Sequence, residues 1–269
     1  MSMATTMQHP SPPTPFAPPA PPARTAASRL LGLLAAFGSG DGAHTLSELS
    51  RRADLSLTTT HRLLQELLAW GGADVDETGR YRLSSKFLAL TSGSTRALRL
   101  RERALPHLMD LQRRTGLCVQ LAARDEDCVM YLESLRPRTD ASIQNRMGAR
   151  LPLHATAAGL VLLAGAGDAD LADYLSRPAR RYTPYTPVDP AELRERLAAV
   201  RRQRYAIASR TVTLQSGSVA APVVGPDGDV LAAVTVLFDA RRHEVRDLAH
   251  ATLATAGRIS RALTARSVD

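Results

Sequence analysis

The first part of the chain alternates apolar and polar positions in a way that predicts three short helices. Leucines recur at helical spacing over residues 28–37, and a glycine-rich stretch ends the run. Thr45 and Glu48 have the spacing of a capping box, so a second short helix is expected to follow them. A third helix is predicted over residues 57–70, and its apolar face carries Leu57, Leu63, Leu64, Leu67 and Leu68.

A small hairpin is predicted directly after these helices. Gly71 and Gly72 end the third helix, and residues 73–76 and 81–83 have the pattern of two short strands joined by a tight turn at residues 77–80. Three helices followed by a hairpin is the order of elements in a winged helix-turn-helix. The pattern therefore favours a DNA-binding domain at this end of the chain.

The remainder of the chain mixes helical and strand patterns. Residues 88–111 have a helical pattern that suits a linker helix, and Pro106 is expected to kink this helix or to start a new one. Further helices are expected over 155–164, 190–203 and 245–263, and strands over 118–122, 128–135, 219–224 and 230–238. This mixture predicts an α+β domain with a mainly antiparallel sheet.

The expected organisation is therefore two domains joined by a linker, and 269 residues are enough for both. The first 23 residues hold eight of the 17 prolines and no charged side chain, so they are expected to be disordered. The predicted divisions are the tail (1–23), the winged helix-turn-helix (24–90), the linker helix (91–104) and an effector-binding and oligomerisation domain (105–265).

Composition narrows the class of protein. The sequence has neither a secretory signal nor an apolar run long enough for a membrane helix, so we expect a cytoplasmic protein without a membrane partner. Cys118 and Cys128 are too few for a disulfide framework and lack the spacing of a zinc site, so no metal or other cofactor is expected.

The net charge of +8 and the pI near 10.3 favour a polyanionic partner. The excess of basic residues also has an explanation that does not involve function. Lys86 is the single lysine and the other basic residues are arginines, a bias that GC-rich coding produces without any functional demand. Charge alone therefore does not establish binding to nucleic acid.

The polar face of the third helix supplies the candidate contacts to DNA. Short hydroxyl side chains at its start can bond phosphates or cap the helix, whereas His61 and Arg62 can reach base edges. On the hairpin, Arg80 and Arg82 alternate and can lie along one phosphate backbone. The alternative to DNA binding is that the helix face is simply solvated and that Arg80 and Arg82 are ordinary surface arginines. His44 is expected on a loop surface. The candidate DNA-binding residues are Ser56, Thr58, Thr59, His61, Arg62, Arg80 and Arg82.

Several motifs resemble the isocitrate lyase regulator (IclR) family of bacterial transcription factors. The resemblance covers residues 24–263. In the N-terminal half the similar segments are 46–49, 60–64 and 81–83, and in the C-terminal half they are 151–159, 181–184 and 220–223. A generic winged helix would not contain the second set.

The resemblance implies a GAF-like or profilin-like effector domain, a homodimer or dimer of dimers, and a pocket for small organic acids. Carried over from the family, the effector-binding residues are Ile143, Leu151, Ala157, Ala158, Ser218, Thr235 and Leu237. Backbone amides at the start of the predicted helix suit a carboxylate. His154 could contact the effector or be a hydrogen-bonded structural histidine, and Thr156 could cap the helix instead. Ser218 and Thr235 could likewise be ordinary strand residues with satisfied hydroxyls.

Some positions depart from the family pattern. Leu160 stands where lysine is usual, Arg204 and Gln215 where glycine is common, and Ser218 where a cysteine or small residue is usual. Residues 208–211 replace the usual acidic stretch, and Leu237 replaces a hydroxyl often found near the expected pocket. We therefore expect an effector more apolar than the smallest two- and three-carbon acids, such as an aromatic acid.

The sequence thus predicts a ligand-responsive regulator, with repression the expected mode, that binds a partly palindromic operator as a dimer. One alternative is an effector-independent DNA-binding protein whose second domain only dimerises. The other is an enzyme, which the sequence argues against because it contains no Walker loop, nucleophile elbow, His-Glu-x-x-His helix or dinucleotide fingerprint.

Overall fold

The computed structural model describes residues 25–38, 42–92, 96–137, 147–241 and 245–265. The predicted tail (1–23) and Ile143 lie outside these ranges. Within them, no helix is long and apolar enough to cross a membrane.

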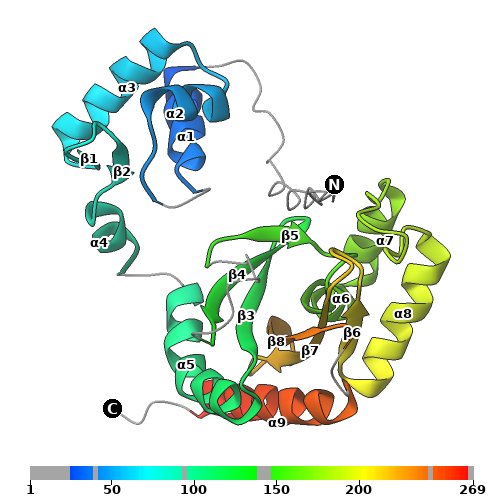
Figure 1. Ribbon diagram of the computed structural model, residues 1–269. Helices are drawn as coiled ribbons and strands as arrows, with labels where there is room; N and C mark the ends of the chain where they lie inside the picture. Colours follow the sequence, from blue (N-terminus) through cyan, green and yellow to red (C-terminus); the bar gives the residue numbers. More distant parts are fainter. Residues whose placement is uncertain (1–24, 39–41, 93–95, 138–146, 242–244, 266–269) are drawn as a thin grey trace, which may run out of the picture.

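The N-terminal elements form the predicted winged helix-turn-helix (Figure 1). They are α1 (Ala26–Ala36), α2 (Leu46–Ala53), α3 (Leu57–Trp70), β1 (Ala73–Val75) and β2 (Tyr81–Leu83). The three helices and β1 share one apolar cluster, in which Leu33, Leu49 and Leu64 are fully buried. This common core holds α3 in a fixed orientation against α1 and α2.

Local sequence sets the turn between α2 and α3. Thr45 and Glu48 form the predicted capping box at the start of α2. Asp54 ends α2 in a left-handed conformation, with φ of 51°, and the Ser50 hydroxyl donates to the Leu55 carbonyl at 2.6 Å. Ser56 then caps α3 by accepting from the Thr59 amide at 3.2 Å. The chain therefore changes direction within a few residues.

Two expectations about this domain are wrong. Leu57 is 52% exposed and does not join the leucines of the buried face, because it stands in the first turn of α3, beyond the reach of the apolar cluster. His44 is buried rather than at the loop surface. Its ring packs edge-on against Phe37 and contacts the Arg52 guanidinium at 3.0 Å, and its backbone bridges to Tyr81.

Two helices follow the wing, α4 (Lys86–Ser92) and α5 (Arg96–Thr115). Pro106 does not start a new helix, because α5 continues through it. Pro106 is exposed, as is Glu102, whose carbonyl loses its helical hydrogen bond and can turn to water instead. The predicted boundary at 104 and 105 therefore falls inside one helix.

The C-terminal domain is built on one six-stranded sheet in which every neighbouring pair is antiparallel. The order across the sheet is β5-β4-β3-β8-β7-β6. The strands are β3 (Cys118–Asp125), β4 (Cys128–Leu135), β5 (Arg150–Pro152), β6 (Ala206–Ser209), β7 (Ser216–Val224) and β8 (Val230–Asp239).

Helices cover both faces of this sheet (Figure 1). One face packs against α5 and α9 (Val245–Thr264), and the other against α6 (Ala157–Ala164), beyond which lie α7 (Asp168–Ser176) and α8 (Pro190–Gln203). Each face has its own apolar cluster. Together these elements form the α+β domain that the sequence predicts.

Candidate DNA-binding and effector sites

The exposed face of α3 carries three of the predicted DNA contacts. Thr58, His61 and Arg62 are exposed, whereas Thr60, on the opposite side, is fully buried. Ser56 and Thr59 bond each other, since the Ser56 hydroxyl donates to Thr59 Oγ1 at 2.9 Å while it caps the helix. The start of α3 is therefore organised by its own hydroxyl groups.

The longer side chains of this face make only exposed contacts. Arg62 Nη1 pairs with Glu66 Oε1 at 2.8 Å, and both side chains are more than half exposed. Gln65 lies 3.4 Å from His61 Nε2. An exposed i,i+4 ion pair stabilises a helix by only about 0.3–0.5 kcal/mol, so Arg62 can exchange Glu66 for a base or a phosphate at small cost.

The wing holds its two arginines differently. Asp76 Oδ1 accepts hydrogen bonds from the amides of Thr78 and Arg80 and from the Thr78 hydroxyl, which fixes the turn and lowers the pKa of Asp76. The Arg80 guanidinium turns back to the Ala43 carbonyl at 3.0 Å. Arg82 lies in β2 opposite Asp74 and is exposed. The structure therefore does not place the two guanidinium groups in equivalent positions.

In the C-terminal domain, the sheet face toward α6 brings predicted effector residues together. Leu237 pairs with Ser218 across β8 and β7, and Thr235 lies two residues before Leu237, on the same face. Leu151 on β5 packs against the apolar cluster of this face, and Ala157 and Ala158 of α6 are part of it. Six of the seven predicted residues therefore lie on one side of the sheet, while Ile143 lies outside the described residues.

The start of α6 is fixed by its own cap. Thr156 Oγ1 accepts from the Gly159 amide at 3.0 Å and donates to the Pro152 carbonyl at 3.2 Å. These bonds favour the capping role that the sequence left open. A Cβ on Gly159 would stand 2.1 Å from the Leu153 carbonyl oxygen, so only glycine permits this close approach.

His154 contacts the surrounding protein through both ring nitrogens. Nδ1 lies 3.0 Å from the Tyr174 hydroxyl and Nε2 lies 2.9 Å from the Arg180 carbonyl oxygen. Burial lowers the pKa of His154 and raises the pKa of Tyr174 to about 12. Both ring nitrogens are therefore engaged within the domain, which favours the structural alternative for this histidine.

Buried threonines explain the 181–184 motif. Thr183 Oγ1 donates to the Arg210 carbonyl at 2.5 Å, and Thr186 Oγ1 donates to the Thr211 carbonyl at 2.7 Å. Thr211 Oγ1 in turn donates to the Ala155 carbonyl at 2.6 Å. The segment after β6 is thereby tied to the residues that precede α6.

The structure extends the predicted Thr235 into a buried polar row, whose other members, Gln120 and Ser134, were not predicted from the sequence. Ser134, Gln120 and Thr235 are neighbours across β4, β3 and β8 on the α6 side of the sheet. Gln120 is fully buried, and its Nε2 donates to Ser134 Oγ at 3.3 Å. Thr235 is 2% exposed, and its Oγ1 has no hydrogen-bond partner in the part of the chain that the structure describes.

A polar contact also joins the sheet to α5. Glu133 Oε2 pairs with Arg101 Nη2 at 2.6 Å, and Glu133 Oε1 accepts from the Ser134 amide at 2.9 Å. Further along α5, Arg103 donates to the Ala262 carbonyl at 3.1 Å. Two arginines of the predicted linker segment therefore hold α5 to the C-terminal domain.

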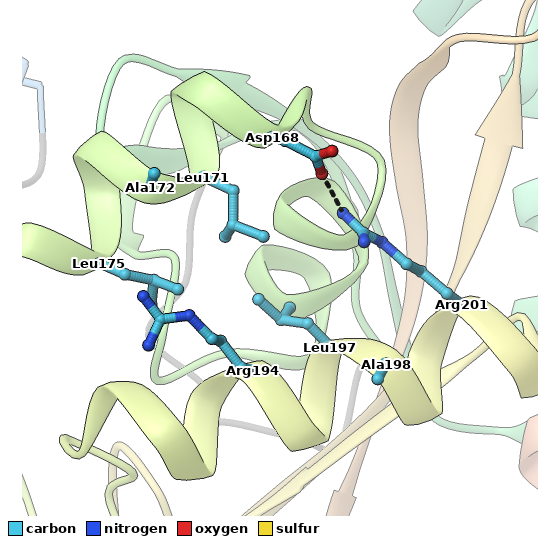
Figure 2. A pocket seen from close by; sticks show the side chains of 8 residues that line it. All are labelled: Asp168, Leu171, Ala172, Leu175, Arg194, Leu197, Ala198 and Arg201. Atoms are coloured by element: carbon cyan, nitrogen blue, oxygen red, sulfur yellow. Dashed lines mark ion pairs between the residues drawn. The ribbon is translucent and has the colours of Figure 1, made fainter.

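A cleft of about 320 Å³ lies elsewhere, between α7 and α8 (Figure 2). Leu171, Leu175 and Leu197 form its apolar side, and Arg201 spans its edge to Asp168 at 3.9 Å. It contains none of the predicted effector residues. Both cysteines are buried free thiols, and no group of metal-binding side chains occurs among the described residues.

Models of known families match both domains. A model described as the IclR helix-turn-helix domain matches residues 26–76, and one described as the bacterial transcriptional regulator IclR C-terminal matches residues 93–261. The second model alone spans more than half of the chain.

Individual relatives agree with these matches. The HTH-type transcriptional regulator XynR of Escherichia coli (strain K12) is 32% identical over 229 residues, which cover 84% of this chain and 90% of XynR. The p-hydroxybenzoate hydroxylase transcriptional activator of Acinetobacter baylyi (strain ATCC 33305 / BD413 / ADP1) is 28% identical over 218 residues, which cover 79% of this chain and 80% of that protein.

A solved structure resembles nearly the whole chain. An IclR homolog from Microbacterium hydrocarbonoxydans, complexed with 4-hydroxybenzoate, has a TM-score of 0.83 and 31% sequence identity. The similarity covers 90% of this chain and all of that one.

Proposed function

Because this chain belongs to the IclR family of bacterial transcriptional regulators, we propose that its binding to operator DNA is controlled by an aromatic acid of the 4-hydroxybenzoate class. The observation that carries this proposal is the gathering of Leu151, Ala157, Thr235 and Leu237 on the α6 face of the sheet, in a chain similar to a homolog that holds 4-hydroxybenzoate. The family consists of regulators, and catalysis forms no part of the proposal.

The apolar character of this face favours an aromatic acid over a very small one. Leu237 is 6% exposed, and Ala157 and Ala158 pack among alanines and leucines. The first amides of a helix have no acceptor within the helix, and they carry the positive end of its dipole. A carboxylate at the start of α6 would therefore be stabilised, with its ring against the apolar side chains.

We assign the DNA contacts to the exposed face of α3 and to the wing. Thr58, His61 and Arg62 would face the major groove, and Arg82 would lie along a phosphate backbone. Ser56 and Thr59 organise the start of the helix, and the Thr59 hydroxyl, which accepts from Ser56, has its own proton to donate to a phosphate. Arg80 contributes positive charge from its position beside Ala43.

Two copies would read a partial palindrome, with recognition helices about 34 Å apart or a multiple of that distance. Leu31 and Leu90 are 65% and 60% exposed and are the kind of side chain that a second copy would cover. A homodimer, or a dimer of two such dimers, would therefore present α3 twice to the operator.

Effector binding must favour one arrangement of the recognition helices, because a ligand with equal affinity for both states shifts nothing. The pair between Arg101 on α5 and Glu133 on β4 is the contact best placed to carry a change in the sheet to α5. We propose that the ligand acts on operator affinity through this contact.

The test is an anisotropy titration of the full chain with labelled DNA from its own upstream region, in the presence of excess random DNA and a panel of aromatic and aliphatic acids. We expect specific binding that an aromatic acid changes. A response to the two- and three-carbon acids alone would contradict the proposed effector class, and specific binding that none of the acids changes would favour the effector-independent alternative. A reporter fused to the same region separates repression, which we expect, from activation.

A variant pair tests the recognition helix in the same assay. Arg62→Ala should weaken specific binding by about 1–3 kcal/mol if the side chain contacts a base, whereas Glu66→Ala removes its helix partner and should leave binding intact or stronger. An equal loss on random DNA would make Arg62 a phosphate contact.

A further inference from the structure

The buried polar row stands out against the rest of the sheet. On the face toward α5 and α9, the neighbouring positions Val119, Leu121, Val234 and Val236 are all apolar and fully buried. On the α6 face, Gln120 and Thr235 occupy positions that are just as deeply buried. A core that only had to be stable would contain apolar side chains at these positions too.

Thr235 differs most clearly from what a purely stabilising core would contain. Its hydroxyl has no hydrogen-bond partner among the described residues, and its side chain is 2% exposed. A buried hydroxyl without a partner costs free energy, and valine would fill nearly the same volume without that cost. An unsatisfied buried group of this kind therefore suggests a partner from outside the chain.

We infer that Gln120 and Thr235 bind the polar group at the end of the effector that is remote from its carboxylate, and that this group is a neutral hydroxyl. The inference rests on the proposed function, since it concerns the same face of the sheet. It adds Gln120, which lies beside Thr235 in the sheet register, as a residue that determines specificity.

The chemistry of the row selects the ligand group. Gln120 has an amide, Ser134 and Thr235 have hydroxyls, and none of the three carries a charge. A phenolic hydroxyl both donates and accepts, so it matches these groups. A second carboxylate would be buried beside neutral groups, at a large desolvation cost. The row therefore favours a hydroxylated monoacid over both an unsubstituted acid and a diacid.

Isothermal titration calorimetry of the full chain with benzoate, 4-hydroxybenzoate and terephthalate tests this assignment. These ligands share a ring and one carboxylate, and differ only in the opposite group. We expect 4-hydroxybenzoate to bind about 3- to 10-fold more tightly than benzoate, the range of one neutral hydrogen bond, and terephthalate to bind most weakly.

Variants locate the preference. Thr235→Val and Gln120→Met should reduce the preference for 4-hydroxybenzoate over benzoate to within about 2-fold while benzoate affinity changes little, because only the opposite group loses its partners. Thr252→Val, a buried threonine of α9 whose hydroxyl donates to the Leu248 carbonyl, is the matched control and should keep the preference. Thermal unfolding checks that each variant folds. If Gln120→Met does not fold, Thr235→Val alone tests the assignment.

The possible outcomes distinguish failure of this assignment from failure of the proposed effector class. If the unchanged protein binds benzoate and 4-hydroxybenzoate equally, or if Thr235→Val keeps the full preference, the polar row does not bind the hydroxyl and the inference is overturned. If neither aromatic acid binds at all, the proposed effector class fails with it.

Discussion

The two faces of the six-stranded sheet bury very different side chains. The face under α5 and α9 is a large apolar cluster that includes Leu121, Val234 and Val236, and the pair between Arg101 and Glu133 lies at one place on it. The face under α6 is apolar around Ala122 and Ala233, but two residues away along β3 and β8 it contains Gln120 and Thr235. One face is built to hold the domain together, and the other combines packing with groups that a ligand can use.

The largest expected effect compares the same substitution on both faces. Leu121→Ala should lower the free energy of unfolding by about 2–5 kcal/mol, since Leu121 is fully buried between the sheet and its helices. Leu237→Ala on the α6 face should cost less, about 2 kcal/mol at the low end of the range for buried leucines, because Leu237 neighbours Ser218 and Cys118 rather than the apolar cluster. Urea denaturation measures both, and equal losses would show that the two faces are packed alike.

A smaller loss in the free energy of unfolding is expected at the polar pair on the α5 face, which Arg101 and Glu133 form. Arg101→Met would leave the nearly buried Glu133 carboxylate without its cation, at a cost of about 1–3 kcal/mol, below that of a fully buried pair because the Arg101 side chain is 31% exposed. Arg101→Met combined with Glu133→Leu should recover part of the loss, which urea denaturation of the two single variants and the double variant would detect. No recovery would mean that the two residues do not act as a pair.

The smallest effect concerns His154, which lies beside the α6 face with Tyr174 and Tyr182 around its ring. Burial lowers its pKa, so the unfolded chain binds its proton more readily than the folded one. The contribution of neutral His154 to the free energy of unfolding is therefore fully present above its ordinary pKa of 6.5. It is lost as the pH falls below that value, by at most about 1.4 kcal/mol per pH unit.

His154→Gln should flatten this decline in the free energy of unfolding between pH 7 and pH 5. Burial also lowers the pKa of His107, so this residue contributes its own part of the slope. His107→Gln serves as the control and should leave the part of the slope that comes from His154 unchanged. An unchanged slope in His154→Gln would show that the ring is already solvated in the folded protein.

Much of the fold could be predicted because it follows from local patterns. The bounds of α3 and α8 agree with the predicted ranges 57–70 and 190–203, since side-chain caps at Ser56 and Asp189 begin these helices. The short strand β6 and the helix α7 were not predicted. The four residues Ala206–Ser209 carry little strand signal, and they pair only because β7 offers them an edge.

The site was harder to predict because its evidence is tertiary. Gln120 in a strand suggests a solvent-facing position, and its burial appears only once α6 covers the sheet. Strict alternation could have placed it on one face with Cys118 and Ala122, which would have been a useful signal. Arg80 shows the same limit, since no sequence rule indicates that its guanidinium turns to the Ala43 carbonyl.

Adjacent residues of β8 allow the most direct test of the difference between the faces, namely thermal unfolding of Thr235→Val and Val236→Thr with and without 4-hydroxybenzoate. Val236→Thr should lower the melting temperature by roughly 2–8 °C, because it buries a hydroxyl among apolar side chains, and should keep the rise that the ligand produces. Thr235→Val should keep or raise the melting temperature without ligand, because it removes a buried hydroxyl that has no partner among the described residues, and it should lose the extra rise that 4-hydroxybenzoate gives over benzoate. A Thr235→Val protein that melts as early as Val236→Thr, with an unchanged response to the ligand, would contradict the account.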